Sequence, residues 1–205
     1  MSMNVEAVMR AAPVIPVLVI EDPAHAEPIA RALVAGGLPV LEVTLRTAAA
    51  LEVITEMKRV PGAIVGAGTV LDPAQLDAAL AAGAEFIVAP GLTERLGHAA
   101  ITSGVPFLPG IANASDIMRG LDLGLTRFKF FPAMASGGLP ALKALAAPFG
   151  QCRFCPTGGI TEASAPEWLA FDPVLCVGGS WVVGKGAPDL AAVEQAARAA
   201  AALRA

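Results

Sequence analysis

Histidine is scarce in this chain, and lysine is almost as scarce. The 205 residues include two histidines, His25 and His98, and four lysines. Both histidines fall in helical patterns without a partner histidine or carboxylate motif, so neither a histidine-based metal site nor a histidine acid–base pair is predicted. We therefore expect no metal and no other cofactor, and each lysine has to be judged by its surroundings.

Long apolar runs and clusters of basic residues are also missing. The longest apolar run, residues 11–20, contains two prolines and falls short of the roughly 20 residues that span a bilayer. The start of the chain shows no basic segment followed by an apolar core and a cleavage site, so we expect a cytoplasmic protein. With a net charge of -4 and no lysine/arginine cluster, neither nucleic acid nor an anionic membrane is expected as a partner.

Cysteine is represented by three residues, of which Cys152 and Cys155 form a C-x-x-C motif. Such a pair can bind zinc or take part in redox chemistry. The surrounding residues predict a strand, however, and residues three apart in a strand point to opposite faces. Because no second C-x-x-C and no nearby histidine completes a zinc site, we interpret the cysteines as buried structural thiols.

The dominant pattern is an alternation of β-branched apolar runs with alanine-rich helical stretches. After a short helix at Val5 to Ala11, about eight strand-then-helix units follow at a spacing of about 20 to 25 residues. Apolar runs of this continuous kind are typical of parallel strands that are buried on both faces. The predicted strands are residues 14–20, 40–45, 63–66, 86–89, 107–108, 128–131, 153–155 and 174–177.

These units predict a single α/β domain over residues 1–205, folded as a (β/α)₈ TIM barrel with a short N-terminal helix. The alternative is a doubly wound open sheet, which usually has an early Gly-x-Gly-x-x-Gly turn that is missing here. No linker divides the chain, and the alanine-rich tail from Leu190 to Ala205 predicts the last helix. In a barrel, functional groups lie at the carboxyl ends of the strands, so the polar residues there are the candidates.

Lys129 lies in the middle of the aromatic run 127–132, which ends in a proline. A two-residue period places Arg127, Lys129 and Phe131 on one face of this strand and two phenylalanines on the other. An amine in an apolar, partly desolvated site loses affinity for its proton and becomes a nucleophile toward carbonyl groups. The alternative is a lysine whose stem packs while its head reaches solvent.

Glu42, Thr44 and Arg46 share one face of the second predicted strand, and Arg46 lies at its end. Charges in such a place are costly unless they are paired or functional. One explanation is an internal ion pair between Glu42 and Arg46. The other is that Arg46 binds a carboxylate with its planar guanidinium group while Glu42 transfers protons. At the end of the third strand, Gly66-Ala67-Gly68 permits close approach of a ligand, and Thr69 adds a hydroxyl group.

Two glycine-rich turns follow the seventh and eighth predicted strands: Thr157-Gly158-Gly159-Ile160 and Gly178-Gly179-Ser180. In barrels, the loops at these two places often bind phosphate through backbone N–H groups and a helix N-terminus. Combined with the lysine, the carboxylate and the carboxylate-binding arginine, the turns predict a Schiff-base enzyme that acts on a phosphorylated keto acid.

The same segments are similar to a known family in order and spacing over nearly the whole chain. The resemblance is to the 2-keto-3-deoxy-6-phosphogluconate (KDPG) and 4-hydroxy-2-oxoglutarate (KHG) aldolase family. It implies a (β/α)₈ barrel, commonly a homotrimer, and a class I, metal-independent aldolase that cleaves KDPG to pyruvate and glyceraldehyde 3-phosphate in the Entner–Doudoroff pathway. Many members also cleave KHG to pyruvate and glyoxylate. The motifs that carry the resemblance are 40–47, 65–71, 128–132, 154–160 and 176–181.

Residue by residue, the resemblance implies that Lys129 forms the Schiff base and Glu42 is the general acid/base. It implies that Arg46 and Thr69 bind the pyruvyl carboxylate. The chain departs from many relatives at Met134, where they have an acidic residue, and around Asn113. The implied phosphate end and walls of the site are Thr157, Gly158, Gly159, Gly179 and Ser180, with Pro90 and Phe131.

Three alternatives to this activity stay open. An aldolase acting on the galactonate epimer belongs to the same family but carries valine at the position of Thr157, so the threonine favours the gluconate substrate. A phosphosugar isomerase or epimerase usually needs a set of metal ligands or a histidine–carboxylate pair. A non-catalytic phosphosugar-binding barrel would use Lys129 only as a charge.

Overall fold

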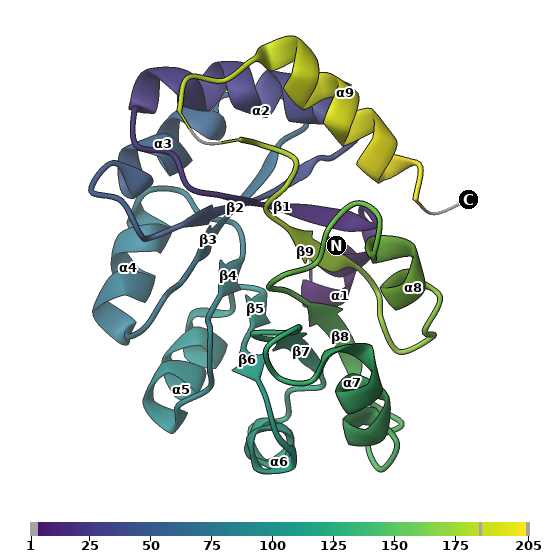
Figure 1. The fold of residues 1–205 in the computed structure, drawn as a ribbon. Coiled ribbons are helices and arrows are strands. Elements are labelled where there is room, and N and C mark those ends of the chain that lie inside the picture. Colours follow the sequence, from purple (N-terminus) through teal and green to yellow (C-terminus); the bar gives the residue numbers. More distant parts are fainter. Residues whose placement is uncertain (1–3, 185, 204–205) are drawn as a thin grey trace.

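The computed structural model describes residues 4–184 and 186–203, along which parallel strands alternate with helices. Helices α2 to α9 lie around the outside of the strands (Figure 1). The expected α/β class with a parallel sheet is confirmed. The strands are β1 (Val14–Leu18), β2 (Val40–Thr44), β3 (Ile64–Gly68), β4 (Ile87–Val88), β5 (Phe107–Leu108), β6 (Gly110–Ile111), β7 (Arg127–Phe130), β8 (Arg153–Pro156) and β9 (Val177–Gly179). The helices are α1 (Val5–Arg10), the 3₁₀ helix η1 (Pro23–His25), α2 (Ala26–Ala35), α3 (Ala50–Met57), α4 (Pro73–Ala81), α5 (Glu94–Ser103), α6 (Ala114–Asp122), α7 (Gly138–Ala146), α8 (Ala165–Leu169) and α9 (Leu190–Ala201).

The strand pairing forms two parallel sheets, of six strands in the order β5-β4-β3-β2-β1-β9 and of three strands in the order β6-β7-β8. Only Pro109 separates β5, which pairs with β4, from β6, which pairs with β7. Proline has no N–H group with which to continue a ladder. Two isolated parallel bridges connect the region of β8 with that of β9: Phe154 of β8 with Val174, which precedes β9, and Thr157, which follows β8, with Gly178 of β9. Within the described residues, the ladders therefore form a curled parallel sheet in two parts and do not join into the single closed eight-stranded barrel predicted from the sequence.

The last predicted strand, 174–177, is displaced in the structure. Val174 forms an isolated bridge with Phe154 of β8, and regular pairing begins at Val177, which lies beside Val14 of β1. The chain thus passes from one sheet to the other within this segment, and β9 extends to Gly179. At the C-terminus, α9 begins at Leu190 as predicted and packs beside α2, whereas its predicted end at Ala205 lies outside the described residues. None of the helices in the described ranges is long and apolar enough to cross a membrane.

Two hydrophobic clusters lie on opposite sides of the strands. The larger one fills the space between strands and helices and includes Phe128 and Phe130 of β7. The smaller one lies inside the curved sheets and joins α1 to residues from both sheets. Because side chains alternate along a strand, this arrangement directs Lys129 of β7 into the interior. The interior cluster contains Val8, Met9, Ile15, Val40, Phe86, Val88, Leu108, Cys155, Leu175 and Cys176.

The C-x-x-C motif follows the same rule. Cys152 belongs to the outer cluster and Cys155 to the interior cluster, and both are buried. Burial raises the pKa of the Cys152 thiol, so it stays protonated at neutral pH. The prediction of buried structural thiols on opposite faces of a strand is confirmed for this pair.

Helix α1 is attached at the amino-terminal end of the strands. The Glu6 carboxylate accepts hydrogen bonds from Nε of Arg10 at 2.7 Å and from Nε of Arg127, the first residue of β7, at 3.0 Å. These two guanidinium groups lower the pKa of Glu6. With Val8 and Met9 packed into the interior cluster, α1 closes this end of the interior.

Candidate active site

Lys129 and Glu42 form a buried pair inside the curved sheets. Nζ of Lys129 on β7 donates a hydrogen bond to Oε1 of Glu42 on β2 at 3.0 Å, and the two residues are 5% and 3% exposed. The amine therefore ends at a carboxylate and not in solvent, which contradicts the alternative of a lysine that reaches water. Among the described residues, the ion pair of Glu42 is with Lys129, so the alternative pairing with Arg46 is also wrong.

The ring of Phe131 covers one side of the amine. Phe131 follows β7 directly, and its centroid lies 5.3 Å from Nζ of Lys129, within the range of a cation–π contact. The peptide bond from Phe131 to Pro132 is cis. The amine thus has a carboxylate and an aromatic face as neighbours in an otherwise apolar interior.

The glycines of β3 make room for side chains of neighbouring strands. Gly66 faces the ring of Phe86, and Gly68 faces the carboxylate of Glu42, so closely that neither position has space for a Cβ atom. These glycines were expected to permit the approach of a ligand. In the structure, the space they leave is occupied by Phe86 and by Glu42.

Thr69 and Pro90 lie where β3 and β4 end. Thr69 has a φ of +61°, in the left-handed region that threonine rarely adopts. Such backbone strain persists where the surrounding structure imposes it, and it is common at binding sites. Pro90 lies against Gly110 of β6, where a Cβ atom would be 2.2 Å from the Pro90 carbonyl carbon. Both residues are partly exposed at the carboxyl ends of their strands.

Arg46 and Ser180, which were predicted for opposite ends of the substrate, line the same cavity. This cavity measures about 640 Å³ and lies at the carboxyl ends of β1, β2 and β9. Its other walls come from residues 17–29 and from the segment that follows β9. Arg46 is exposed, and its Nε donates a hydrogen bond of 3.4 Å to Oγ1 of Thr44. Thr44 shares a strand face with Arg46, a signal visible in the sequence, but the pattern alone gives this threonine no role.

The two glycine-rich turns are adjacent in space. Thr157 forms a parallel bridge with Gly178, where a Cβ atom would lie 2.2 Å from the buried Oγ1 of Thr157. Gly158 and Gly159 have φ values of +106° and +79°, which only glycine adopts at little cost. The backbone N–H of Met134 donates to the carbonyl oxygen of Gly158 at 3.0 Å. The segments that follow β7 and β8 therefore meet beside β9.

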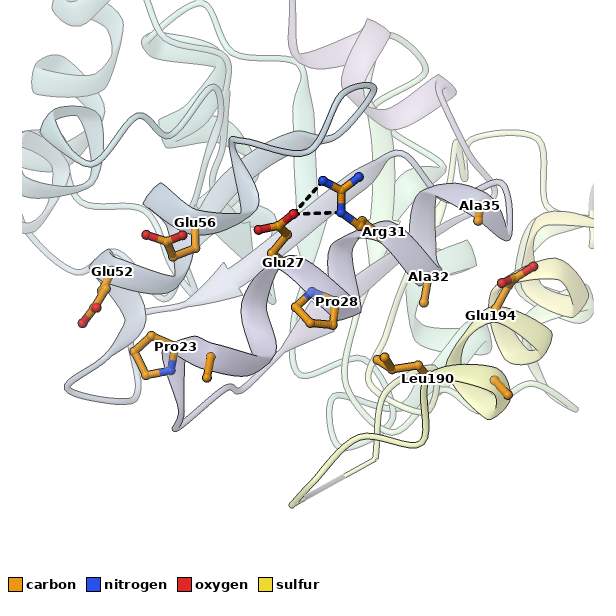
Figure 2. A pocket seen from close by; sticks show the side chains of 12 residues that line it. Pro23, Glu27, Pro28, Arg31, Ala32, Ala35, Glu52, Glu56, Leu190 and Glu194 are labelled. Atoms are coloured by element: carbon orange, nitrogen blue, oxygen red, sulfur yellow. Dashed lines mark hydrogen bonds and ion pairs between the residues drawn. The ribbon is translucent and has the colours of Figure 1, made fainter.

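A larger cavity, of about 940 Å³, lies on the outside of the molecule between α2, α3 and the start of α9 (Figure 2). Its charged lining consists of Glu27, Glu52, Glu56 and Glu194 with Arg31, which is bound to Glu27. None of the predicted site residues lines it, and its excess of carboxylates is unsuited to an anion. In the described part of the chain, no three histidine, cysteine, aspartate or glutamate side chains are placed to hold a metal ion.

Comparison with known proteins shows to which family the chain belongs. The family model described as "KDPG and KHG aldolase" matches residues 5–196. The 2-dehydro-3-deoxy-phosphogluconate aldolase of Zymomonas mobilis is 62% identical over 201 residues, which cover 98% of this chain and 97% of that protein. The crystal structure of the Zymomonas mobilis KDPG aldolase with 3-phosphoglycerate superimposes with a TM-score of 0.97 at 61% identity, covering 100% of this chain and 98% of the other. The Legionella pneumophila KDPG aldolase, with pyruvate captured as a covalent carbinolamine intermediate, gives a TM-score of 0.94 at 43% identity and covers 98% of this chain and 100% of the other. This chain therefore belongs to the KDPG and KHG aldolase family.

Proposed function

We propose that this chain is a class I aldolase that cleaves KDPG to pyruvate and D-glyceraldehyde 3-phosphate in the Entner–Doudoroff pathway. The observation that carries the proposal is the buried pair of Lys129 and Glu42, with 3.0 Å between Nζ and Oε1. Imine chemistry needs an amine nucleophile beside a group that transfers protons. The relatives that match this chain over almost its full length are named as KDPG aldolases.

Lys129 is the proposed nucleophile. An ammonium group has no lone pair for a ketone, so Lys129 first gives a proton to Glu42 across their hydrogen bond. The neutral amine then attacks C2 of the keto acid and forms a carbinolamine. Glu42 returns this proton to the carbinolamine hydroxyl group, which leaves as water and gives a protonated imine, and Glu42 is a carboxylate again. The imine withdraws electrons from the C3–C4 bond.

Glu42 is the proposed general base and acid. Its carboxylate removes the proton of the C4 hydroxyl group, directly or through a water molecule, and the C3–C4 bond breaks. The electron pair of that bond forms an enamine on C3, and glyceraldehyde 3-phosphate leaves. The carboxylic acid then returns the proton to C3, and hydrolysis of the imine frees pyruvate and Lys129.

The remaining predicted residues hold the two anionic ends of the substrate. Arg46 and Thr69 are assigned to the pyruvyl carboxylate, which a guanidinium group can bind with two parallel hydrogen bonds. Pro90 and Phe131 are assigned to the walls. The contact between Thr157 and Gly178 supports a common phosphate end, and the shared cavity of Arg46 and Ser180, which Lys129 and Glu42 do not line, supports the proximity of the two ends. The phosphate is assigned to Thr157, Gly158, Gly159, Gly179 and Ser180, whose glycines expose backbone N–H groups.

The proposal also covers the fold and the assembly. We assign residues 1–205 to one (β/α)₈ barrel domain, supported by the single residue between β5 and β6 and by the bridges between β8 and β9. A homotrimer and a cytoplasmic location complete the proposal, together with a side activity that cleaves KHG to pyruvate and glyoxylate. The only partner proposed is the small phosphorylated keto acid.

The decisive test is to incubate the protein with pyruvate and borohydride, digest it, and locate the reduced imine by mass spectrometry. We expect one pyruvate-derived adduct, on the peptide that contains Lys129, and neither adduct nor KDPG cleavage in Lys129→Ala. Lys58 and Lys143 serve as internal controls, and Lys185, outside the described residues, is monitored in the same digest. An adduct at one of those three lysines, or no adduct at all, would refute the site. The absence of an adduct is also what an isomerase or a non-catalytic binding barrel would give.

The choice between the gluconate and galactonate substrates needs a separate measurement. We expect kcat/KM to be higher for KDPG than for its C4 epimer, and Thr157→Val to reduce this preference. The buried position of Oγ1 of Thr157, against Gly178, supports a role in selecting one orientation of the substrate. A wild-type preference for the galactonate form would overturn the substrate assignment but not the imine chemistry.

A further inference from the structure

Thr44, the last residue of β2, is a buried polar residue beside the proposed site, with an exposed fraction of 2%. Its Oγ1 donates a hydrogen bond of 2.8 Å to the carbonyl oxygen of Leu18, the last residue of β1. A hydroxyl group has a single proton and two lone pairs. With its proton committed to Leu18, Oγ1 acts only as an acceptor toward Nε of Arg46, which lies 3.4 Å away.

The residues before and after Arg46 in the chain are hydrogen-bonded to the end of β1 and the segment just after it. Before it, Thr44 binds Leu18, and after it, Oγ1 of Thr47 donates to the carbonyl oxygen of Ile20 at 2.8 Å. The two anchors differ in one respect. Thr44 contacts the guanidinium group, whereas the hydrogen bond of Thr47 goes to the backbone of the neighbouring segment.

Within the described part of the chain, the bond from Nε to Thr44 is the one hydrogen bond that the Arg46 guanidinium donates to protein. A guanidinium group is planar, so when Nε donates its hydrogen bond to Thr44, the two terminal nitrogens point away from Thr44. Those nitrogens form the edge that matches a carboxylate. Arg46 lines the 640 Å³ cavity, whose other charged lining residues are Glu21 and Asp22, with His25 beside them.

We propose that Thr44 is a positioning residue for this reaction: its hydroxyl oxygen holds Nε of Arg46 so that the terminal nitrogens are presented to the substrate carboxylate. A long exposed side chain loses rotamer freedom when it binds a ligand, and fixing it beforehand reduces that loss. The inference rests on the proposed function, because it takes Arg46 to be the carboxylate-binding group.

The measurement is the rate at which borohydride traps pyruvate on the protein, taken at increasing pyruvate concentrations. Pyruvate has the carboxylate and no phosphate, so the initial slope of this plot reports the carboxylate end alone and needs no saturation. Thr44→Val removes the hydroxyl group and keeps the shape, and we expect it to lower the slope about 3- to 10-fold, the effect of one ordinary hydrogen bond. Thr44→Ser keeps the hydroxyl group and restores the slope.

A double-mutant cycle separates positioning from a merely structural role. In an Arg46→Ala background, Thr44→Val is expected to change the slope by less than about twofold, because the group through which Thr44 acts is gone. Thr47→Val is the matched control: it removes the other anchor, so it lowers the melting temperature but leaves the slope close to wild type. If Thr44→Val is not obtained as folded protein, Thr44→Ala replaces it in the cycle.

Two results would overturn the inference: an unchanged slope in Thr44→Val, or an equal loss in the wild-type and Arg46→Ala backgrounds. Failure of the proposed function is distinguishable from both, because the wild-type protein would then give no adduct on Lys129. An adduct that forms normally while Thr44→Val has no effect rejects only the role of Thr44.

Discussion

A Cβ atom on Gly68 would lie 2.3 Å from Oε1 of Glu42 and 2.7 Å from its Cγ. The carboxylate can therefore occupy its position beside Lys129 only because residue 68 has no side chain. Gly68 pairs with Thr44 in the ladder between β2 and β3, so the backbone that creates this space is held by regular strand pairing. The geometry of the proposed acid–base group thus depends on a residue that takes no part in the chemistry.

Gly68→Ala tests this dependence. The added methyl group is expected to push the Glu42 carboxylate away from Nζ of Lys129, lowering kcat for KDPG cleavage about 10- to 100-fold, less than complete loss of a general base. Gly68 does not have a positive φ, so its backbone accepts alanine. Gly150→Ala is the control, since nothing lies within 4 Å of a Cβ atom there. A wild-type kcat in Gly68→Ala would show that Glu42 tolerates displacement.

Glu42→Gln removes the charge and keeps the size of the side chain. We expect kcat to fall about 10²- to 10⁴-fold, the usual contribution of a general acid–base group. The imine with pyruvate should still form, slowly, because Lys129 is intact, and borohydride trapping measures this separately. Glu56→Gln, which alters an ion pair on the surface with Arg59, should leave both quantities unchanged. Full activity in Glu42→Gln would exclude Glu42 as the base.

Gly159→Ala addresses the phosphate end of the site. The residue has a φ of +79°, and a Cβ atom would lie 2.8 Å from Cγ of Met134, so alanine distorts the turn. We expect KM for KDPG to rise about tenfold, equivalent to one charge-assisted hydrogen bond, while trapping of the unphosphorylated pyruvate stays near wild type. Gly104→Ala is a matched control, because Gly104 also has a positive φ, +73°, but ends α5 in open space. If Gly159→Ala impaired KDPG cleavage and pyruvate trapping equally, Gly159 would not act through phosphate binding.

Glu6, on α1 at the amino-terminal end of the strands, makes the stability of the fold depend on pH. Hydrogen bonds from Arg10 and Arg127 depress the pKa of Glu6 in the folded protein. A depressed pKa stabilises the folded state above the unfolded value of about 4.3, and this stabilisation is lost as the pH falls through the folded pKa. Glu6→Gln should therefore have a lower melting temperature than wild type at pH 7. The loss in the free energy of unfolding should be less than about 1 kcal/mol, because Glu6 and Arg127 are only partly buried.

The same comparison at acid pH completes the test. As the pH falls from the unfolded value through the lowered folded pKa of Glu6, the carboxylate of the wild type becomes protonated, and the difference between wild type and Glu6→Gln should shrink. Glu27→Gln, which alters an exposed ion pair with Arg31 on α2, provides a control for a surface carboxylate away from α1. A difference that grows toward low pH would contradict the sign of the shift.

The orientation of Lys129 could be predicted from the sequence because it depends on a local rule. Alternation along a strand needs only the neighbours of Lys129, and both phenylalanines beside it do face the outer cluster. Its partner could not be predicted in this way. Glu42 is 87 residues away in the chain, and the local pattern on β2 fitted a pair with Arg46 equally well. Choosing between them requires the positions of β2 and β7 relative to each other.

The division of the sheet was missed for a related reason. Residues 107–108 were predicted as one strand, but Gly110–Ile111 forms a second short strand after Pro109. Glycine and proline have low strand propensity, so a two-residue strand that begins with glycine gives no signal in the sequence. Tertiary contact decides here, because Gly110 lies against the backbone of Pro90, where a side chain would not fit.

Helix α1 carries no group of the proposed reaction, yet it limits the routes by which reactants can reach the site. Within the described part of the chain, Val8 and Met9 fill the amino-terminal end of the interior, so reactants enter and leave at the carboxyl ends of the strands. In such a blind-ended site, two products cannot depart by separate routes. In the proposed mechanism, the aldehyde departs first, since pyruvate is still bonded to Lys129 when the C3–C4 bond breaks. Product inhibition should then be competitive for pyruvate and not for glyceraldehyde 3-phosphate, the pattern of ordered release.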